Sequence, residues 1–191
     1  MQEIAPGLTQ WIRFYDEWNA DVASYALETG DGLVLLDPLD PPRELRRPAH
    51  VVLTLFYHAR STAELRPRRI WAPRRSVKPL ERRGVRVTDV LDAGDGGPGA
   101  IRALASGRPS ELAYWLPEQR ALYAGDVLLG SPLRICPDSW VGKGGQTAVR
   151  AALEPALELP IARVLVSHGD PVLRGGRRAL EQALLQAPSA A

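Results

Sequence analysis

The chain has 191 residues, of which 45% are hydrophobic and 24% are charged, and its formal net charge is +2. This length fits one large domain, and the composition is that of a globular protein, which argues against extensive disorder. We expect a single domain over residues 1–186. Residues 187–191 lack a periodic apolar pattern and are expected to form a frayed tail.

The N-terminal residues show no basic segment followed by an apolar one, and no apolar run approaches the length of a membrane span. The single cysteine, Cys136, cannot form a disulfide within the chain, as is typical of proteins in a reducing compartment. We therefore expect a cytoplasmic protein without membrane contact.

Basic residues are concentrated between residues 66 and 86, where nine of them face a single acidic residue, Glu81. A patch of this kind can attract phosphate backbones. Its aromatic content is limited to Trp71, however, and no nucleic-acid motif accompanies it. We expect a small-molecule ligand or substrate rather than nucleic acid, and the sequence leaves homo-oligomerisation open.

Two segments are predicted to be β-hairpins. Residues 22–28 and 33–37 are apolar strands around a Gly-rich turn, and residues 111–116 and 121–126 flank a turn that begins at a proline. The first return strand ends in Asp37 and the second in Asp126. This repetition indicates a two-fold architecture with both aspartates near one rim.

Strands and helices alternate in the rest of the chain. Apolar runs predict strands at residues 51–55, 70–73, 85–88 and 164–166. Helical spacing and a capping serine predict helices that begin near Ser61 and that cover residues 147–157 and 176–185. Residues 92–99 are rich in glycine and are predicted to form a loop. This alternation favours an α/β or α+β arrangement.

Several polar residues follow predicted strands. His168 follows strand 164–166, Asp126 ends the second hairpin, and His58 and Arg60 come just after strand 51–55. Side chains at strand ends can face a cleft while the strand holds them rigid. His50 precedes a strand and is expected to be structural. We therefore predict a site formed by the other two histidines with Arg60 and Asp126.

The order of these motifs resembles the metallo-β-lactamase superfamily. Residues 122–126 resemble the strand that ends in its metal-bridging Gly-Asp carboxylate, residues 164–169 the strand that ends in its last histidine ligand, and residues 32–37 its early strand that ends in aspartate. The resemblance covers about residues 23–185. It implies a four-layer αββα sandwich of the α+β class and a hydrolase-like ancestry.

The residues that bind metal in this superfamily are mostly replaced. Its signature Thr-His-x-His-x-Asp-His aligns with residues 54–60, and its middle histidine aligns with residue 107. The replacements are Leu55 and Tyr57 for the first-site histidines, Ala59 and Arg60 for the second-site aspartate and histidine, and Gly107 for the middle histidine. Only Asp126 and His168 remain in register, so the resemblance implies that the dinuclear zinc centre is lost.

Two interpretations remain open. The chain is either a divergent hydrolase for a small ester, thioester or lactone, or a non-catalytic ligand-binding or interaction protein that retains the fold. As a hydrolase it would hold one zinc or other divalent ion through His58, Asp126 and His168, or it would work without metal. In the metal-free form His168 is the general base and Arg60 the electrostatic stabiliser.

Arg60 carries one further expectation. It aligns with a histidine that would bind the same ion as Asp126, and its guanidinium is permanently charged. We therefore expect the Arg60 guanidinium to lie against the Asp126 carboxylate and to replace the charge of the missing metal.

Overall fold

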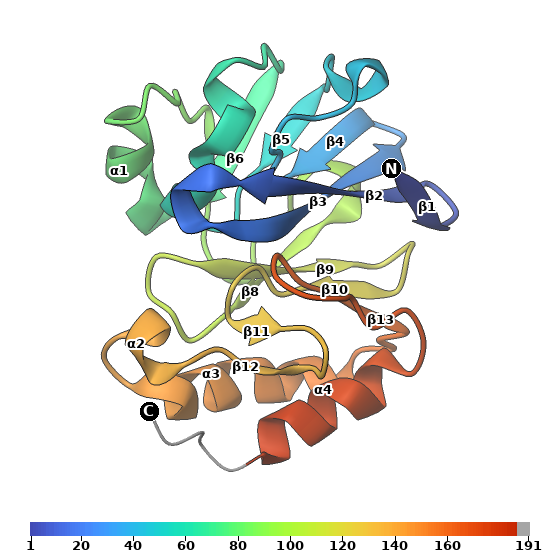
Figure 1. Ribbon diagram of the computed structural model, residues 1–191, viewed down its shortest axis with the longest axis vertical. Coiled ribbons are helices and arrows are strands. Elements are labelled where there is room, and N and C mark those ends of the chain that lie inside the picture. Colours follow the sequence, from blue (N-terminus) through green and yellow to red (C-terminus); the bar gives the residue numbers. More distant parts are fainter. Residues whose placement is uncertain (187–191) are drawn as a thin grey trace.

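Two β-sheets pack face to face with helices on both outer sides, and this αββα arrangement confirms the expected fold class (Figure 1). The computed structural model describes residues 1–186. The tail expected at residues 187–191 lies outside the described residues.

The first sheet contains seven strands in sequence order. They are β1 (Gln2–Ala5), β2 (Leu8–Tyr15), β3 (Ala20–Thr29), β4 (Gly32–Leu36), β5 (His50–Val52), β6 (Arg69–Pro73) and β7 (Asp89–Leu91). Neighbouring strands are antiparallel from β1 to β4 and parallel from β4 to β7. The carboxyl ends of β4 and β5 therefore lie at one edge of this sheet.

The second sheet has the order β13-β10-β9-β8. Its strands are β8 (Arg102–Ala105), β9 (Leu112–Leu116), β10 (Ala121–Tyr123) and β13 (Arg163–Leu165), and a separate two-stranded ribbon pairs β11 (Leu128–Leu129) with β12 (Arg134–Ile135). Because β10 and β13 are parallel, the residues that follow them also emerge at one edge.

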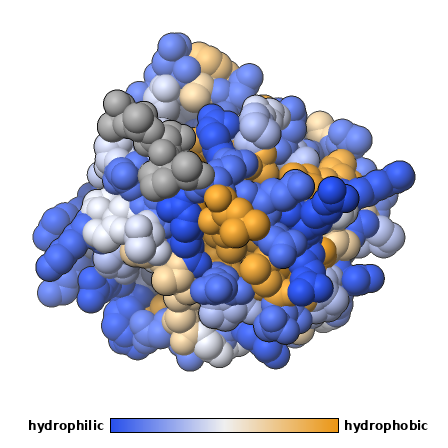
Figure 2. All heavy atoms as spheres, turned by 90° about the horizontal axis from the view of Figure 1, so that it is seen from below, coloured by the Kyte–Doolittle hydropathy of each residue, from blue (hydrophilic) through white to orange (hydrophobic). Residues whose placement is uncertain are grey.

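Helices cover the outer faces of both sheets (Figure 1). The α-helices are α1 (Val77–Glu81), α2 (Asp138–Val141), α3 (Gly145–Leu153) and α4 (Gly176–Leu185). The 3-10 helices are η1 (Asp16–Trp18), η2 (Arg43–Leu45), η3 (Phe56–Ala63), η4 (Arg74–Ser76), η5 (Pro98–Ala100) and η6 (Glu154–Glu158). The face covered by α3 and α4 is mainly hydrophilic, with hydrophobic side chains gathered near its middle (Figure 2). No helix within residues 1–186 is long and apolar enough to cross a membrane.

Three buried tyrosines connect the two sheets through their hydroxyl groups. Tyr25 donates a hydrogen bond to the carbonyl of Val166 at 2.8 Å, and Tyr114 donates to the carbonyl of Leu53 at 2.8 Å. Tyr123 donates to the carboxylate of Asp37 at 2.6 Å. Each bond runs from a strand of one sheet to a residue that follows a strand of the other. The hydroxyls therefore align the strand ends of the two sheets at a common edge.

The structure confirms both predicted hairpins, the strands near residues 51, 70 and 164, and the closing helix. Three predictions of elements were wrong. The strand expected at residues 85–88 lies at β7 instead, the helix expected over residues 147–157 becomes a 3-10 helix beyond Leu153, where Pro155 interrupts it, and Ser61 does not start a helix. The Ser61 hydroxyl accepts a hydrogen bond from the Asp40 N–H at 2.9 Å, and η3 begins five residues earlier.

We predict that Tyr123→Phe lowers the free energy of unfolding by about 1.5–3 kcal/mol, because a buried ionised carboxylate loses a hydrogen-bond donor. Tyr114→Phe is the matched control, since it removes an equally buried hydroxyl whose acceptor is a neutral carbonyl. Its cost should be about 0.5–1.5 kcal/mol. Urea denaturation measures both, and equal losses would contradict a special role for the Asp37 contact.

Candidate active site

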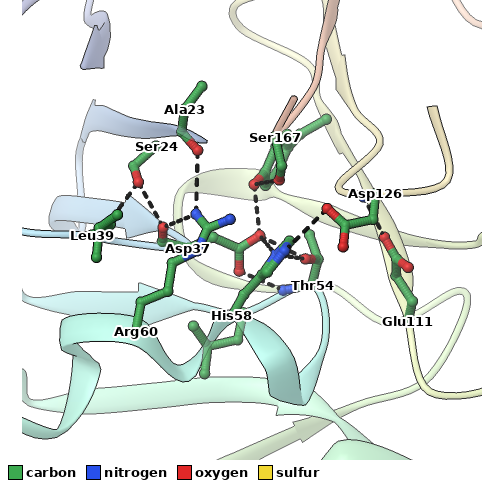
Figure 3. Close-up of polar contacts among 12 residues, drawn as sticks. Ala23, Ser24, Asp37, Leu39, Thr54, His58, Arg60, Glu111, Asp126 and Ser167 are labelled. Atoms are coloured by element: carbon green, nitrogen blue, oxygen red, sulfur yellow. Dashed lines mark hydrogen bonds and ion pairs between the residues drawn. The ribbon is translucent and has the colours of Figure 1, made fainter. Parts of the chain in front are cut away.

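The carboxylate of Asp37, which follows β4, is fully buried at the centre of the site (Figure 3). Its Oδ1 accepts a hydrogen bond from the N–H of Thr54 at 2.8 Å, and its Oδ2 accepts from the hydroxyls of Thr54 and Tyr123, each at 2.6 Å. The Nδ1 of His58 lies 2.7 Å from the same Oδ2. Burial alone would raise the pKa of Asp37, but the positive charges of His58 and Arg60 lower it below its ordinary value.

The imidazole of His58, on η3, lies between two carboxylates (Figure 3). Its Nε2 is 3.1 Å from Oδ1 of Asp126, an ion-pair contact in which neither atom has the alignment of a good hydrogen bond. Burial and the charge of Arg60 oppose protonation, but Asp126 and Asp37 outweigh them and raise the pKa of His58 to about 9. At neutral pH His58 is therefore a buried imidazolium that offsets two negative charges.

Asp126 reaches the site from the second sheet. Its N–H donates a hydrogen bond to Oε1 of Glu111 at 2.7 Å. The preceding residue, Gly125, has a φ of 55°, and a side chain there would collide with the Glu111 carboxylate, so this close approach requires glycine. Burial would raise the pKa of Asp126, but His58, followed by His168, lowers it well below its ordinary range.

Arg108 and Glu111 form an ion pair in the loop between β8 and β9. The Nη1 of Arg108 lies 3.2 Å from Oε2 of Glu111 and 3.9 Å from Oδ2 of Asp126. Burial and the charge of Asp126 raise the pKa of Glu111 to about 8. Because Glu111 is then largely protonated at neutral pH, Arg108 remains a cation whose nearest ionised carboxylate is Asp126.

His168 follows β13 and faces Asp126. Its Nε2 lies 3.5 Å from Oδ1 of Asp126, which is too long for a well-formed hydrogen bond. Burial lowers the pKa of His168 below its ordinary value, and the charge of His58 adds to this effect, although Asp126 opposes it. His168 is therefore mainly neutral at neutral pH, and its Nε2 is free to accept a proton.

These side chains open onto a cavity of about 410 Å³. Its walls are formed by Trp18, Ala20, Tyr57, Arg108, Asp126, Trp140 and His168. Trp18 from η1 and Trp140 from α2 flank the imidazole of His168, with ring centroids 6.0 Å and 5.8 Å away. Aromatic walls with a few convergent polar groups are typical of a site that binds a small organic molecule.

The predicted ion pair between Arg60 and Asp126 is wrong. The Nη1 of Arg60 donates hydrogen bonds to the carbonyls of Asp37 at 2.8 Å and Ala23 at 3.3 Å, and its guanidinium lies 5.7 Å from the Trp18 ring centroid. The backbone of Arg60 breaks the helical path of η3 with φ 38° and ψ −126°, which turns the side chain toward β3. His58 occupies the position between the carboxylates that we expected Arg60 to fill.

The structure brings three of the four predicted site residues together. His58, Asp126 and His168 form a continuous set of contacts, and Arg60 lies beside them on the far side of Asp37. Asp37 and Asp126 lie on the same rim, as the repeated hairpins indicated, because a single imidazole contacts both.

The residues present do not fit the dinuclear zinc centre that the superfamily would imply. Leu55 and Ala59 are buried in the apolar core beside the first sheet, and Tyr57 is 43% exposed at the mouth of the cavity. A side chain at Gly107 would come within 2.5 Å of the backbone of Ala148 in α3. Within residues 1–186, no group of three or more histidine, cysteine, aspartate or glutamate side chains is arranged to hold a metal ion.

Sequence reasoning missed Arg108, Glu111 and the two tryptophans as site residues. Arg108 directly follows Gly107, the position aligned with a metal ligand, and this adjacency was the available signal. Glu111 opens the strand of the second hairpin, where a carboxylate reads as an exposed turn residue. Trp18 and Trp140 lie in segments without a motif, and only the fold brings them to His168.

No family model matches the chain, and no curated protein matches it in sequence. Solved structures do resemble it. They include a metallo-β-lactamase from Erythrobacter litoralis (17% identity, 96% of this chain, 93% of that chain, TM-score 0.71), FIM-1 from Pseudomonas aeruginosa in a mono-zinc form (16%, 95%, 91%, 0.64) and TTHA1623 in a di-iron-bound form (22%, 91%, 98%, 0.68). The chain therefore has the metallo-β-lactamase fold.

We predict that His58→Gln lowers the free energy of unfolding by about 3–5 kcal/mol, because it removes the cation between two buried carboxylates. Adding Asp126→Asn should recover part of this loss, since one stranded charge is then gone. The corresponding pair Arg60→Met and Asp126→Asn should show a smaller coupling. Denaturation midpoints of the single and double variants measure both couplings, and a larger coupling for Arg60 would restore the original assignment.

We also predict that the chain does not retain two equivalents of zinc. Leu55, Tyr57, Ala59 and Gly107 supply no metal-binding atoms, and Arg60 faces carbonyl oxygens. Elemental analysis after zinc loading and gel filtration tests this, with the unloaded protein as control. Two tightly held zinc ions per chain would contradict our description of the site.

Proposed function

We propose that this chain is a divergent hydrolase-like enzyme of the metallo-β-lactamase fold that acts on a small ester, thioester or lactone without a dinuclear zinc centre. The supporting observation is the position of His58, a buried imidazole between the carboxylates of Asp37 and Asp126. It offsets the charge of these carboxylates from inside the protein. Asp126, His168 and Arg108 are thereby left at the wall of the cavity.

His168 is the general base in this proposal. Its side chain is 17% exposed and lines the cavity, so a water molecule there can reach its Nε2. When His168 takes a proton from that water, the nearby Asp126 carboxylate stabilises the imidazolium that forms. The resulting hydroxide attacks the carbonyl carbon of the substrate.

Arg108 replaces Arg60 as the electrostatic stabiliser. Arg60 directs its donors at backbone carbonyls, whereas Arg108 lines the cavity beside Asp126. A fixed guanidinium near the substrate stabilises the negative charge that develops on the carbonyl oxygen. The pairing of Arg108 with Glu111 holds it in place for this role.

The metal-free form is favoured over a site for one zinc or other divalent ion. A metal bound by His58, Asp126 and His168 would need the lone pair of His58 Nε2. That nitrogen faces the Asp126 carboxylate while Nδ1 faces the Asp37 carboxylate, an arrangement that suits a doubly protonated ring.

A ligand-binding protein without catalysis is the second candidate. The observation that favours it is the aromatic wall of Trp18, Tyr57 and Trp140, which could hold a small molecule without any chemistry. The two candidates differ in whether a bound ester is cleaved.

We predict that protein dialysed against EDTA hydrolyses 4-nitrophenyl acetate, phenyl thioacetate or dihydrocoumarin as fast as untreated protein. His168→Gln should lower kcat by about 10²–10⁴-fold, and Arg108→Gln by about 10²–10³-fold. His50→Gln is the control, since His50 pairs with Trp71 far from the cavity.

Initial-rate spectrophotometry decides between the alternatives. Activity that disappears on chelation and returns with zinc would establish the mononuclear form. Binding of these compounds without turnover would establish the ligand-binding protein.

A further inference from the structure

A second cavity, of about 510 Å³, adjoins the first at Arg108. It lies between the carboxyl ends of β6 and β7 and the loop that joins β8 to β9. Its polar wall consists of Arg74, Arg75, Asp92, Ser106, Arg108 and Glu111. Arg108 is the residue common to the walls of both cavities, so its side chain marks where one site passes into the other.

The loop that carries Arg108 is held rigidly. Gly107 has a φ of 86° and packs directly on the backbone of α3. The Ser106 hydroxyl donates a hydrogen bond to the Glu111 carbonyl at 2.8 Å and accepts one from the Arg108 N–H at 3.2 Å. The wall between the two cavities is therefore a built part of the fold.

The arginines of the second cavity differ in their partners. Arg74 is bound to the Asp92 carboxylate by hydrogen bonds of 2.6, 2.8 and 3.2 Å, and Arg108 is paired with Glu111. Arg75 is exposed on η4 and makes no side-chain hydrogen bond or ion pair with the described residues. Its guanidinium is thus a cation on the cavity wall whose donors face no carboxylate of the chain.

We propose that the substrate carries a carboxylate tail, which Arg75 binds in the second cavity while the scissile carbonyl lies beside Arg108 in the first. The proposal rests on the proposed function for the position of the reactive group, but the binding of the tail does not depend on turnover. A guanidinium matches the two oxygens of a carboxylate. A singly charged group suits this wall better than a doubly charged phosphate, because the Asp92 carboxylate lies close by.

Calorimetric titration with two uncleavable probes tests the proposal. N-phenylglutaramic acid has a phenyl ring, an amide carbonyl and a carboxylate tail, and N-phenylpentanediamide replaces the tail with a neutral amide. We expect the wild-type chain to bind the acid about tenfold more tightly, as is typical for one hydrogen-bonded charge pair. Arg75→Gln should abolish this preference. Arg82→Gln, which removes another exposed arginine nearby, should retain it.

Equal affinity of the wild-type chain for both probes, binding of neither, or equal effects of the two substitutions would overturn the proposal. Preferential binding of the acid through Arg75, together with no hydrolysis of any ester, would support the carboxylate site and reject the hydrolase function. The two proposals can therefore fail separately.

Discussion

A carboxylate with no exposure to solvent needs a hydrogen-bond donor for each of its lone pairs, and Asp37 imposes this requirement on the whole rim. Its donors come from the segment after β5, from η3 and from β10. These segments belong to both sheets, so satisfying one side chain fixes how the sheets meet. The positions of His58 and Tyr123, and through them that of Asp126, follow from this one buried charge.

The same constraint explains how the site can hold two acidic groups so close together. Two buried carboxylates repel each other unless a positive charge lies between them. An imidazolium meets this need with two N–H groups on opposite sides of a flat ring, one for each carboxylate. Glu111 is accommodated in another way, since burial beside Asp126 favours its protonated form. The site thus balances its charge with protons.

Local patterns in the sequence predicted the parts of the fold that depend on them. Alternating apolar residues around Gly or Pro turns located both hairpins, and strand ends located Asp126 and His168. Strands β1, β2 and β8 were not predicted, because their residues mix exposed and buried positions without a clear turn signal. The role of His58 could not be predicted, since it depends on a left-handed break at Arg60 and on the packing of two sheets.

Gly107 has a consequence for how this chain could change. A histidine placed there would meet the backbone of α3 at a distance that no side-chain rotation relieves. Restoring the ancestral set of metal-binding residues one at a time would therefore not rebuild the ancestral centre. The helix and the loop would have to separate first, and that shift would disturb the wall that holds Arg108. The packing of one backbone on another acts here as an evolutionary ratchet, which makes return harder than departure.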